Sequence, residues 1–300
     1  MKPSLIFRQY TWLVNLLRQY KRLTFEEISN HWIEDEIGDG NPLSRSTFNR
    51  HRDALLDMFG IIIECDKNNG YEYYIDNPET LNDNSITHWM LSTLTVNNML
   101  VDSLSLKNKI LLENIPNGDQ YFSTIIKALK THHKLTIHYQ RFNGESSVKT
   151  VAPYTLKLFH QRWYLFTFTG NHYAIYSLDR ISKIDIAEET FTMPDDFSPE
   201  QYFSEYFGIY SDNSIPMEHI IIRAYELQKY YLQTLPMHHS QRIINEGENY
   251  ADFAMDLRPT SDFVSEILSK AEYLEVLEPL WLREEIADTI KKMQKNYKKI

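Results

Sequence analysis

The sequence predicts an α+β protein built from several domains, and three patterns along its 300 residues support this assignment. Residues 1–78 combine three helix-like segments with a β-hairpin, residues 123–205 contain a series of short strands, and residues 212–300 alternate strands and helices. Residues 79–122 show helical spacing of apolar residues and are expected to connect the first two modules. Since domains usually hold about 100–200 residues, a chain of this length has room for two or three separate cores.

Capping residues mark two helix starts in the first module. Thr24 followed by Glu27 is a capping box for a second helix, and Ser44 is a favourable N-cap for a third helix over residues 45–58. Two strand-like runs then flank Asn69-Gly70, which is a strong signal for a β-hairpin.

Three helices and a hairpin predict a winged helix-turn-helix, in which the third helix enters the major groove and the hairpin lies along the DNA backbone. Base edges and phosphates come within reach of polar side chains in the first turns of such a helix. Arg52 falls near the apolar side of the helix and is expected to lie along that surface instead. A small helical domain that contacts other proteins is the alternative for this module. The candidate DNA contacts are Arg45, Ser46, Thr47, Asn49 and Arg50 on the helix, with Lys67 and Asn68 at the hairpin tip.

The composition is that of a globular chain, with 42% hydrophobic and 24% charged residues. Its apolar runs reach only a few residues, whereas roughly 20 are needed to span a bilayer, and the first residues lack the apolar core of a signal peptide. The single cysteine, Cys65, excludes an internal disulfide and any zinc site built from several cysteines. We therefore expect a cytoplasmic protein with no membrane partner, no cofactor and no metal.

The net charge of −10 is unevenly distributed along the chain. Residues 123–186 contain nine Lys and Arg against three Asp and Glu, whereas residues 187–300 contain 11 against 21. A basic segment beside acidic ones indicates a module that binds an anion, although a chance cluster of solvated lysines would give the same count.

The basic segment also has the pattern of a small β-barrel or sandwich, because short strands alternate with turn signals every ~8–12 residues. Tyr139 and Arg141 share one face of their expected strand, as do Arg162 and Tyr164. Guanidinium groups pair with phosphates and rings provide stacking surfaces for bases, so this pattern is typical of a nucleotide or oligonucleotide site.

Four short motifs in this region resemble the WYL-domain family: Gly144-Glu145, Pro153-Tyr154, the triplet Trp163-Tyr164-Leu165, and Leu178-Asp179-Arg180-Ile181. The resemblance extends along nearly the whole chain. It implies a bacterial transcription regulator with an N-terminal winged helix-turn-helix, a central Sm/SH3-like WYL barrel and a C-terminal extension. It also implies that the barrel senses a nucleotide or nucleic-acid ligand and alters DNA binding. The ligand contacts that the resemblance implies are Tyr139, Lys149, Arg162, Ser177 and Arg180, with Arg141 and His160 nearby.

The chain departs from the family pattern at several positions, namely Ala174 and Lys149 in the barrel and His51 and Arg52 in the third helix. Trp163 is expected in the core of the barrel, because a central strand buries large apolar residues. Arg180 is either a ligand contact or half of a buried ion pair with Asp179 or another carboxylate.

The last module predicts the order βαββαβ followed by a helix, which is the ferredoxin-like pattern. Ser261 or Asp262 is expected to cap its second helix. On the last helix, apolar residues form one stripe that serves either core packing or a dimer face. The resemblance favours a homodimer, which suits a helix-turn-helix that binds paired half-sites. The stripe consists of Leu282, Ile286, Ile290, Met293 and Tyr297.

No catalytic motif is present: the sequence has no P-loop, no glycine-rich dinucleotide turn and no Gly-x-Ser-x-Gly elbow. We therefore expect no enzymatic activity. Two other functions remain open, an accessory protein that binds single-stranded nucleic acid without an operator, and a nucleic-acid hydrolase. The hydrolase would need a carboxylate cluster, and the basic module has only Glu145, Asp179 and Asp185.

Overall fold

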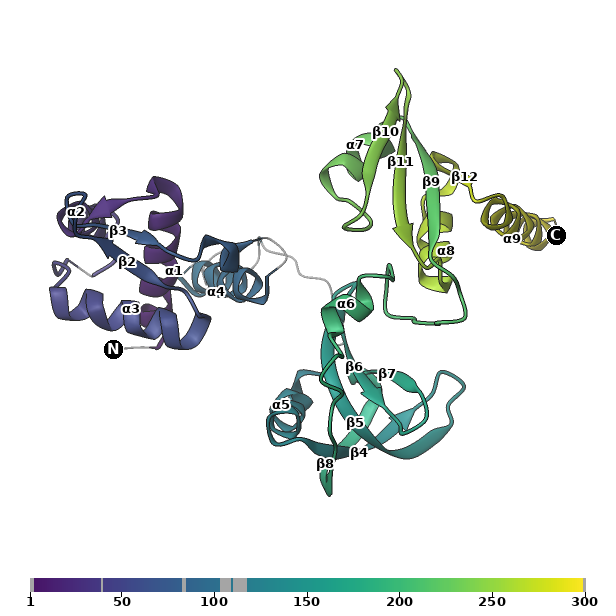
Figure 1. Ribbon diagram of the computed structural model, residues 1–300, viewed down its shortest axis with the longest axis horizontal. Coiled ribbons are helices and arrows are strands. Elements are labelled where there is room, and N and C mark those ends of the chain that lie inside the picture. The colour runs from purple at the N-terminus through teal and green to yellow at the C-terminus, as the bar shows by residue number, and fades with distance from the viewer. Residues whose placement is uncertain (1–2, 39, 83–84, 103–108, 110–117, 299–300) are drawn as a thin grey trace. The chain divides into compact units, whose positions relative to one another are not determined.

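The structure is a computed structural model that describes residues 3–38, 40–82, 85–102, 109 and 118–298. It is a mixed α/β chain with several antiparallel sheets, and it divides into two compact units, Met1–Glu113 and Asn114–Ile300 (Figure 1). The part of the expected connecting helix that includes Leu104 and residues 110–112 lies outside the described residues. In the described part of the chain, no helix is long and apolar enough to cross a membrane.

The first unit packs helices against a small antiparallel sheet with the strand order β1-β3-β2. Its core is built from buried residues of all three leading helices, such as Leu13, Ile28 and Phe48. Its elements are α1 (Pro3–Tyr20), β1 (Leu23–Thr24), α2 (Phe25–Glu34), α3 (Arg45–Phe59), β2 (Ile63–Asp66), β3 (Glu72–Ile75), the short 3-10 helix η1 (Pro78–Leu81) and α4 (Ile86–Asp102).

The helix boundaries of this unit follow from local chemistry. The Thr24 and Glu27 side chains form the complete capping box at the start of α2, and the Ser44 hydroxyl accepts a hydrogen bond from the Thr47 amide at the start of α3. Both predicted N-caps, Thr24 for α2 and Ser44 for α3, are confirmed. Gly60 ends α3 with φ 65°, a left-handed conformation that costs glycine no steric strain.

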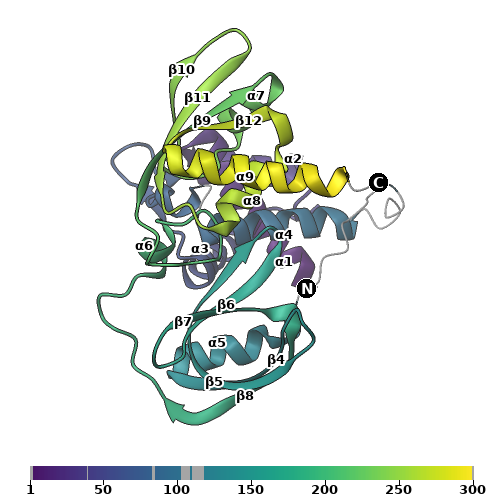
Figure 2. The ribbon, with the colours of Figure 1, turned by 90° about the vertical axis from the view of Figure 1, so that its right-hand side faces the viewer.

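The second unit begins with α5 (Phe122–Thr131) and a five-stranded antiparallel sheet with the order β7-β6-β5-β4-β8. Figure 2 shows the sheet curving strongly, with α5 lying across it. Ile125 and Ala128 of α5 are fully buried against Leu135, Ile137 and other core residues of the strands. The strands are β4 (His133–Gln140), β5 (Ser146–Phe159), β6 (Arg162–Phe168), β7 (Tyr173–Ser177) and β8 (Ile181–Thr190), with the 3-10 turn η4 (Leu178–Arg180) between the last two.

A C-terminal sheet with the order β10-β11-β9-β12 follows in the same unit. Its elements alternate as βαββαβ and end in a helix, in the order expected from the sequence. The elements are β9 (Glu218–Tyr225), α7 (Leu227–Thr234), β10 (Arg242–Glu246), β11 (Tyr250–Leu257), α8 (Ser261–Ser269), β12 (Leu274–Glu278) and α9 (Leu280–Tyr297).

The start of helix α8 differs from expectation. Thr260, rather than Ser261 or Asp262, occupies the N-cap of α8, and Asp262 instead accepts hydrogen bonds from the Ile209 and Tyr210 amides. The Asp262 carboxylate is therefore used to hold a distant loop, which sequence periodicity cannot predict.

The apolar stripe of α9 divides into two halves. Leu282 and Ile286 are buried in the core, as the packing interpretation predicted. Ile290, Met293 and Tyr297 are 53%, 44% and 79% exposed, so the distal half of the stripe lies outside the core.

Strand β10 forms one edge of the C-terminal sheet, and all five of its residues are exposed, including Ile243 and Ile244. Its pairing with β11 shifts register between Ile243 and Asn245, which marks a β-bulge. The Arg242 guanidinium binds the Asp256 carboxylate at 3.0 Å.

An aromatic segment connects the two sheets of the second unit. It includes the short helix α6 (Pro199–Phe203), and Phe197 and Phe203 from this segment pack against Phe166 of the first sheet. Farther along, the Arg258 guanidinium of the C-terminal module donates to the Glu205 carboxylate at 2.7 Å. The segment is therefore fixed at both ends by side-chain contacts.

Candidate nucleic-acid and ligand sites

Helix α3 has one solvent face that is polar, on which the Ser46 hydroxyl lies 3.0 Å from the Ser44 hydroxyl. Ser46, Asn49 and Arg50 are exposed on it, while Phe48 and Leu55 are fully buried on the opposite side. Arg50 forms no hydrogen bond or ion pair with any residue that the structure describes, so its guanidinium keeps all of its donors available.

The two other arginines of α3 are bound to their own domain. The Arg45 guanidinium lies 4.1 Å from the centre of the Phe25 ring and donates to the Tyr73 hydroxyl at 3.3 Å. Arg52 donates through Nε and Nη2 to the Ile63 carbonyl. The sequence interpretation of Arg52 as a residue that lies along the domain surface is confirmed, whereas Arg45, although exposed, already has internal partners.

The remaining candidates for DNA contact lie at the start of α3 and in the β2–β3 turn. Thr47 is half-buried, and its hydroxyl accepts a hydrogen bond from the Ser44 hydroxyl at 2.9 Å, so it belongs to the helix cap. Lys67 and Asn68 are exposed in the turn, and the Asn68 amide donates to the Asp66 carboxylate. Asp66 therefore orders this turn and leaves the Lys67 and Asn68 side chains in solvent.

His51 follows Arg50 and is buried between two rings. The centre of its imidazole lies 5.2 Å from the centre of the Tyr10 ring and 5.9 Å from that of Trp32. Burial, together with a smaller effect of the nearby Arg50 charge, lowers the pKa of His51 to about 4. At neutral pH the residue is an uncharged core side chain, not a contact for a phosphate.

In the second unit, four candidate residues gather where β4 meets the β7–η4 corner. The Tyr139 hydroxyl lies 3.3 Å from the buried Ser177 hydroxyl. The Arg180 guanidinium lies 5.7 Å from the centre of the Tyr139 ring and 3.4 Å from the centre of the Phe142 ring. Both distances fall within the range of cation–π contact, so Arg180 is held by two rings rather than by a carboxylate.

Arg162 joins this corner through Asp179, because its Nη2 lies 3.2 Å from the Asp179 carboxylate. A buried ion pair between Arg180 and Asp179, one of the two alternatives for Arg180, is not found among the described residues, and Asp179 pairs with Arg162 instead. Two buried polar atoms at the corner, Asp179 Oδ1 and Arg180 Nη1, have no hydrogen-bond partner among the residues that the structure describes. Such atoms are costly unless they gain a partner, so they mark a place where a ligand or water would be stabilised.

Three other candidates lie farther out. Lys149 is exposed and pairs with Ile137 across β4 and β5, which places it on the sheet face that carries Tyr139. Arg141 is exposed and pairs weakly with Glu145 at 3.7 Å. His160 lies in the β5–β6 turn and stacks on Phe159 at 4.0 Å, and among the described residues it has no contact with the corner.

The sequence did not single out Phe142 or the role of Asp179. Phe142 is 89% exposed, and the centre of its ring lies 3.4 Å from the Arg180 guanidinium. Its place between Arg141 and the Asn143-Gly144 turn is a signal that could have suggested a stacking residue at the hairpin tip.

Trp163 of the WYL triplet is half-buried and packs edge-on against Phe122 of α5, with ring centres 4.9 Å apart, next to the core of the five-stranded sheet that holds Leu165. Cys65 is free and half-buried in β2. Among the described residues, no group of three His, Cys, Asp or Glu side chains is arranged to hold a metal ion.

Comparison with solved structures finds similar chains at low identity, among them the following two. "Proteasome accessory factor B/C (PafBC) of Arthrobacter aurescens" is 18% identical, with a TM-score of 0.37 over 94% of this chain and 45% of that chain. A "CRISPR Cas-related protein" is 13% identical, with a TM-score of 0.39 over 89% of this chain and 76% of that chain. The chain thus spans less than half the length of the first of these.

No curated protein sequence matches the chain. Two family models do match it, the WYL domain over residues 120–186 and the WCX domain over residues 216–294. The first range contains α5, the five-stranded sheet as far as Ile186 and the corner around Arg180, and the second contains the C-terminal sheet. The chain therefore contains a WYL domain followed by a WCX domain.

Proposed function

We propose that this protein is a DNA-binding transcription regulator whose WYL domain binds a nucleotide or a single-stranded nucleic acid and thereby modulates operator binding. In this proposal the first unit is a winged helix-turn-helix, the WYL domain is an Sm/SH3-like barrel, and the C-terminal module is a ferredoxin-like extension. The proposal includes no catalytic step.

The observation that carries the proposal is the contrast among the arginines of α3. Arg45 donates to the Tyr73 hydroxyl and Arg52 to the Ile63 carbonyl. Arg50 is exposed beside Ser46 and Asn49 and has no hydrogen-bond or ion-pair partner among the described residues. A recognition helix needs such a face, because side chains that read bases or contact phosphates must not be satisfied internally. The exposed Lys67 at the hairpin tip adds a second cation in the same unit.

The corner formed by Tyr139, Phe142, Arg162, Ser177, Asp179 and Arg180, called the WYL corner below, supports the proposal that the WYL domain binds a ligand. The rings of Tyr139 and Phe142 offer stacking surfaces, Arg180 and Arg162 offer positive charge, and two buried polar atoms there lack partners. Aromatic rings beside guanidinium groups suit an unpaired base with its phosphate.

A homodimer is the assembly that fits this function, since paired reader domains recognise paired half-sites. The exposed distal half of α9 offers apolar area for subunit contact. Ligand binding would then regulate transcription if it favoured one placement of the two reader domains.

The test is binding of the purified chain to its own upstream intergenic DNA and to a scrambled duplex across a series of salt concentrations. Each phosphate contact should contribute about −0.9 to the slope of log affinity against log salt, and a specificity ratio above roughly 1000 establishes an operator. The Arg50→Ala protein should lose duplex affinity, whereas Lys291→Ala, which removes an exposed cation of α9 paired with Asp288, should not.

One result would favour the accessory-protein function instead. If the chain bound single-stranded DNA tightly, failed to bind either duplex at low salt, and was unaffected by Arg50→Ala, the barrel alone would act on nucleic acid. The exposed Phe142 ring is the observation that keeps this second function in view. Nuclease activity lost in Asp179→Asn would contradict both non-catalytic functions.

A further inference from the structure

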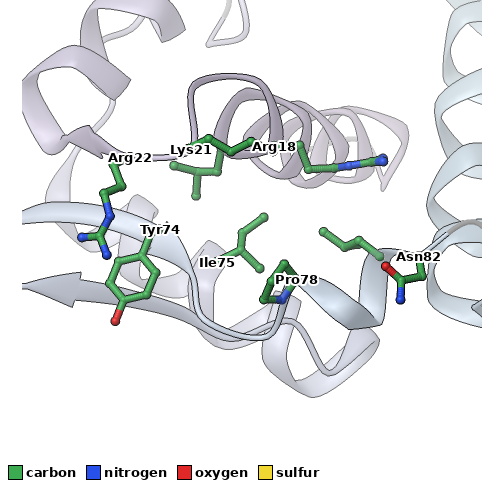
Figure 3. A pocket seen from close by; sticks show the side chains of 9 residues that line it. Arg18, Lys21, Arg22, Tyr74, Ile75, Pro78 and Asn82 are labelled. Carbon is green, nitrogen blue, oxygen red and sulfur yellow. The ribbon is translucent and has the colours of Figure 1, made fainter.

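A pocket of about 440 Å³ opens in the first unit between the end of α1 and the segment that follows β3 (Figure 3). It lies outside the WYL domain and includes none of the residues of α3. We propose that this pocket binds a small organic anion, with a carboxylate or phosphate head group and a compact apolar body.

The apolar body is inferred from the floor of the pocket. Leu17 and Leu81 are buried there, and Ile75 and Pro78 lie beside them in the centre of the view in Figure 3. Small-molecule sites typically have volumes of about 300–1000 Å³ and combine an apolar lining with a few polar groups. The pocket meets both conditions, because its volume lies in this range and its apolar residues are accompanied by a few polar ones.

The anionic head group is inferred from the charges on that rim. Arg18 and Lys21 are exposed and form no ion pair with any described residue, and among the described residues that line the pocket none is acidic. Arg22 completes the set, but it is already bound to the Asp66 carboxylate at 3.0 Å and lies over the Tyr74 ring at 4.3 Å. The pocket therefore offers two free cations and one that is fixed in place.

The backbone conformation at Lys21 is one that glycine adopts more readily. Lys21 has φ 68°, and its amide donates to the Leu17 carbonyl just after α1 ends. A side chain is strained in this left-handed conformation, whereas glycine is not. The Lys21 side chain lines the pocket, so glycine at this position would keep the turn and remove only the cation.

This pocket and the proposed DNA site are associated with opposite faces of the β1-β3-β2 sheet. Tyr73 and Tyr74 are consecutive in β3 and so point to opposite faces. Tyr73 packs edge-on against Phe48 of α3 at 4.7 Å, whereas Tyr74 lines the pocket with Arg22. The pocket thus opens away from the face of the sheet that supports α3, and its cations are separate from those offered to the duplex.

Calorimetric titration of the full-length chain with simple probes tests the proposal. The probes are 2-naphthoate and 2-naphthyl phosphate, with neutral 2-naphthamide and inorganic phosphate as controls that lack the head group or the body. At least one naphthyl anion should bind, and both controls should bind at least roughly tenfold more weakly, since each lacks one of the two contacts. The tighter of the two anions identifies the head group.

The decisive variant is Lys21→Gly, which removes the cation and leaves a residue that prefers the backbone conformation found there. It should melt no lower than the parent chain and should weaken probe binding by roughly tenfold or more. Glu36→Gly is the matched control, because Glu36 also has φ 52° but does not line the pocket. Its melting should change in the same direction without any effect on probe binding.

Three results would overturn the proposal. The first is saturation by neither naphthyl anion, and the second is probe binding that Lys21→Gly and Arg18→Gln leave unchanged. The third is loss of duplex affinity in these two variants without any probe binding, which would assign the cations to the DNA backbone. Lys21 and Arg18 both belong to the first unit, so probe binding that their substitution weakens is assigned to this pocket whether or not the WYL domain also binds the probes.

Discussion

Helix α3 and the WYL corner both hold arginines beside aromatic rings, but they use them in opposite ways. In α3, Arg45 and Arg52 are bound internally and Arg50 is left free between them. At the WYL corner, Arg162 pairs with Asp179, and Arg180 lies over two rings. The comparison shows that the sequence pattern of Arg beside aromatic residues does not by itself identify a cation available to a partner.

The difference has a physical origin. A helix turns each residue by 100°, so Arg50 and Arg52 point to different sides, one toward solvent and one toward the sheet. At the corner, by contrast, the chain folds back through η4 and brings several polar groups into one partly buried place. A ligand of α3 meets a free cation, whereas a ligand of the corner must compete with internal partners.

The largest expected effect compares the buried histidine of each unit. His51 lies between rings, and His238 donates to the Ser204 carbonyl, yet burial lowers the pKa of each to about 4 from an ordinary value of 6.5. Between pH 6.5 and pH 4 the unfolded state binds more protons than the folded state. The free energy of unfolding should therefore fall with decreasing pH, by up to roughly 3 kcal/mol for each histidine.

Urea denaturation at several pH values between 4 and 7 measures this effect. The His51→Phe protein should keep the stability of its first unit at pH 5, while the second unit, which retains His238, should remain sensitive to acid. A parent chain whose unfolding midpoints do not change over this pH range would contradict the burial of both histidines.

The next effect separates Arg50 from Arg52. Arg52→Ala leaves the Ile63 carbonyl without its donor and should lower the free energy of unfolding by about 1–3 kcal/mol. Arg50→Ala should change stability by no more than about 0.5 kcal/mol but weaken duplex binding by about 1–3 kcal/mol. Thermal unfolding and duplex titration on both variants check the assignment, and equal losses of stability would show that Arg50 is not free.

A smaller effect is expected when Arg162 is released from its ion pair, so that, like Arg50, it has no carboxylate partner. Asp179→Asn removes the carboxylate that binds Arg162, so a short single-stranded oligonucleotide should bind more tightly, by about 1 kcal/mol or less. The control is Asp185→Asn, which removes an exposed carboxylate that binds Lys183 in the same domain. Weaker oligonucleotide binding in Asp179→Asn alone would mean that the carboxylate contacts the ligand directly.

The smallest effect concerns Arg141. Its pairing with Glu145 is exposed, with side chains 59% and 65% accessible, so Arg141→Ala should alter stability by less than about 0.5 kcal/mol. Oligonucleotide affinity should fall slightly at low salt and not at high salt, because screening removes the contribution of an exposed charge. A large loss at high salt would place Arg141 inside the site.

Local rules explain which parts of the fold the sequence predicted. The capping residues Thr24 and Ser44, the Asn69-Gly70 hairpin and the alternation of the C-terminal module depend on neighbouring residues or on a repeating period, so they can be read directly. The core face of α3 and the surface position of Arg52 follow from helical angle in the same way.

Contacts between distant segments could not be predicted. The contact of Arg180 with Phe142 joins residues 38 positions apart and depends on strand register and on η4, while Asp262 binds amides more than 50 positions away. His160 was grouped with the ligand contacts because it is close to Arg162 in sequence, but the β5–β6 turn directs it to Phe159. Sequence identified the types of residue in the site but not which pairs would form.

The bulged edge strand β10 has a consequence for how the protein behaves at high concentration. An open edge that carries Ile243 and Ile244 is a template for strand addition by another molecule. The break in register beside Ile243, and the charges of Arg242 and Glu246 at the two ends of the strand, make a continuous ladder of hydrogen bonds unfavourable. These features protect the folded chain from sheet-to-sheet aggregation without requiring any other element to cover the edge.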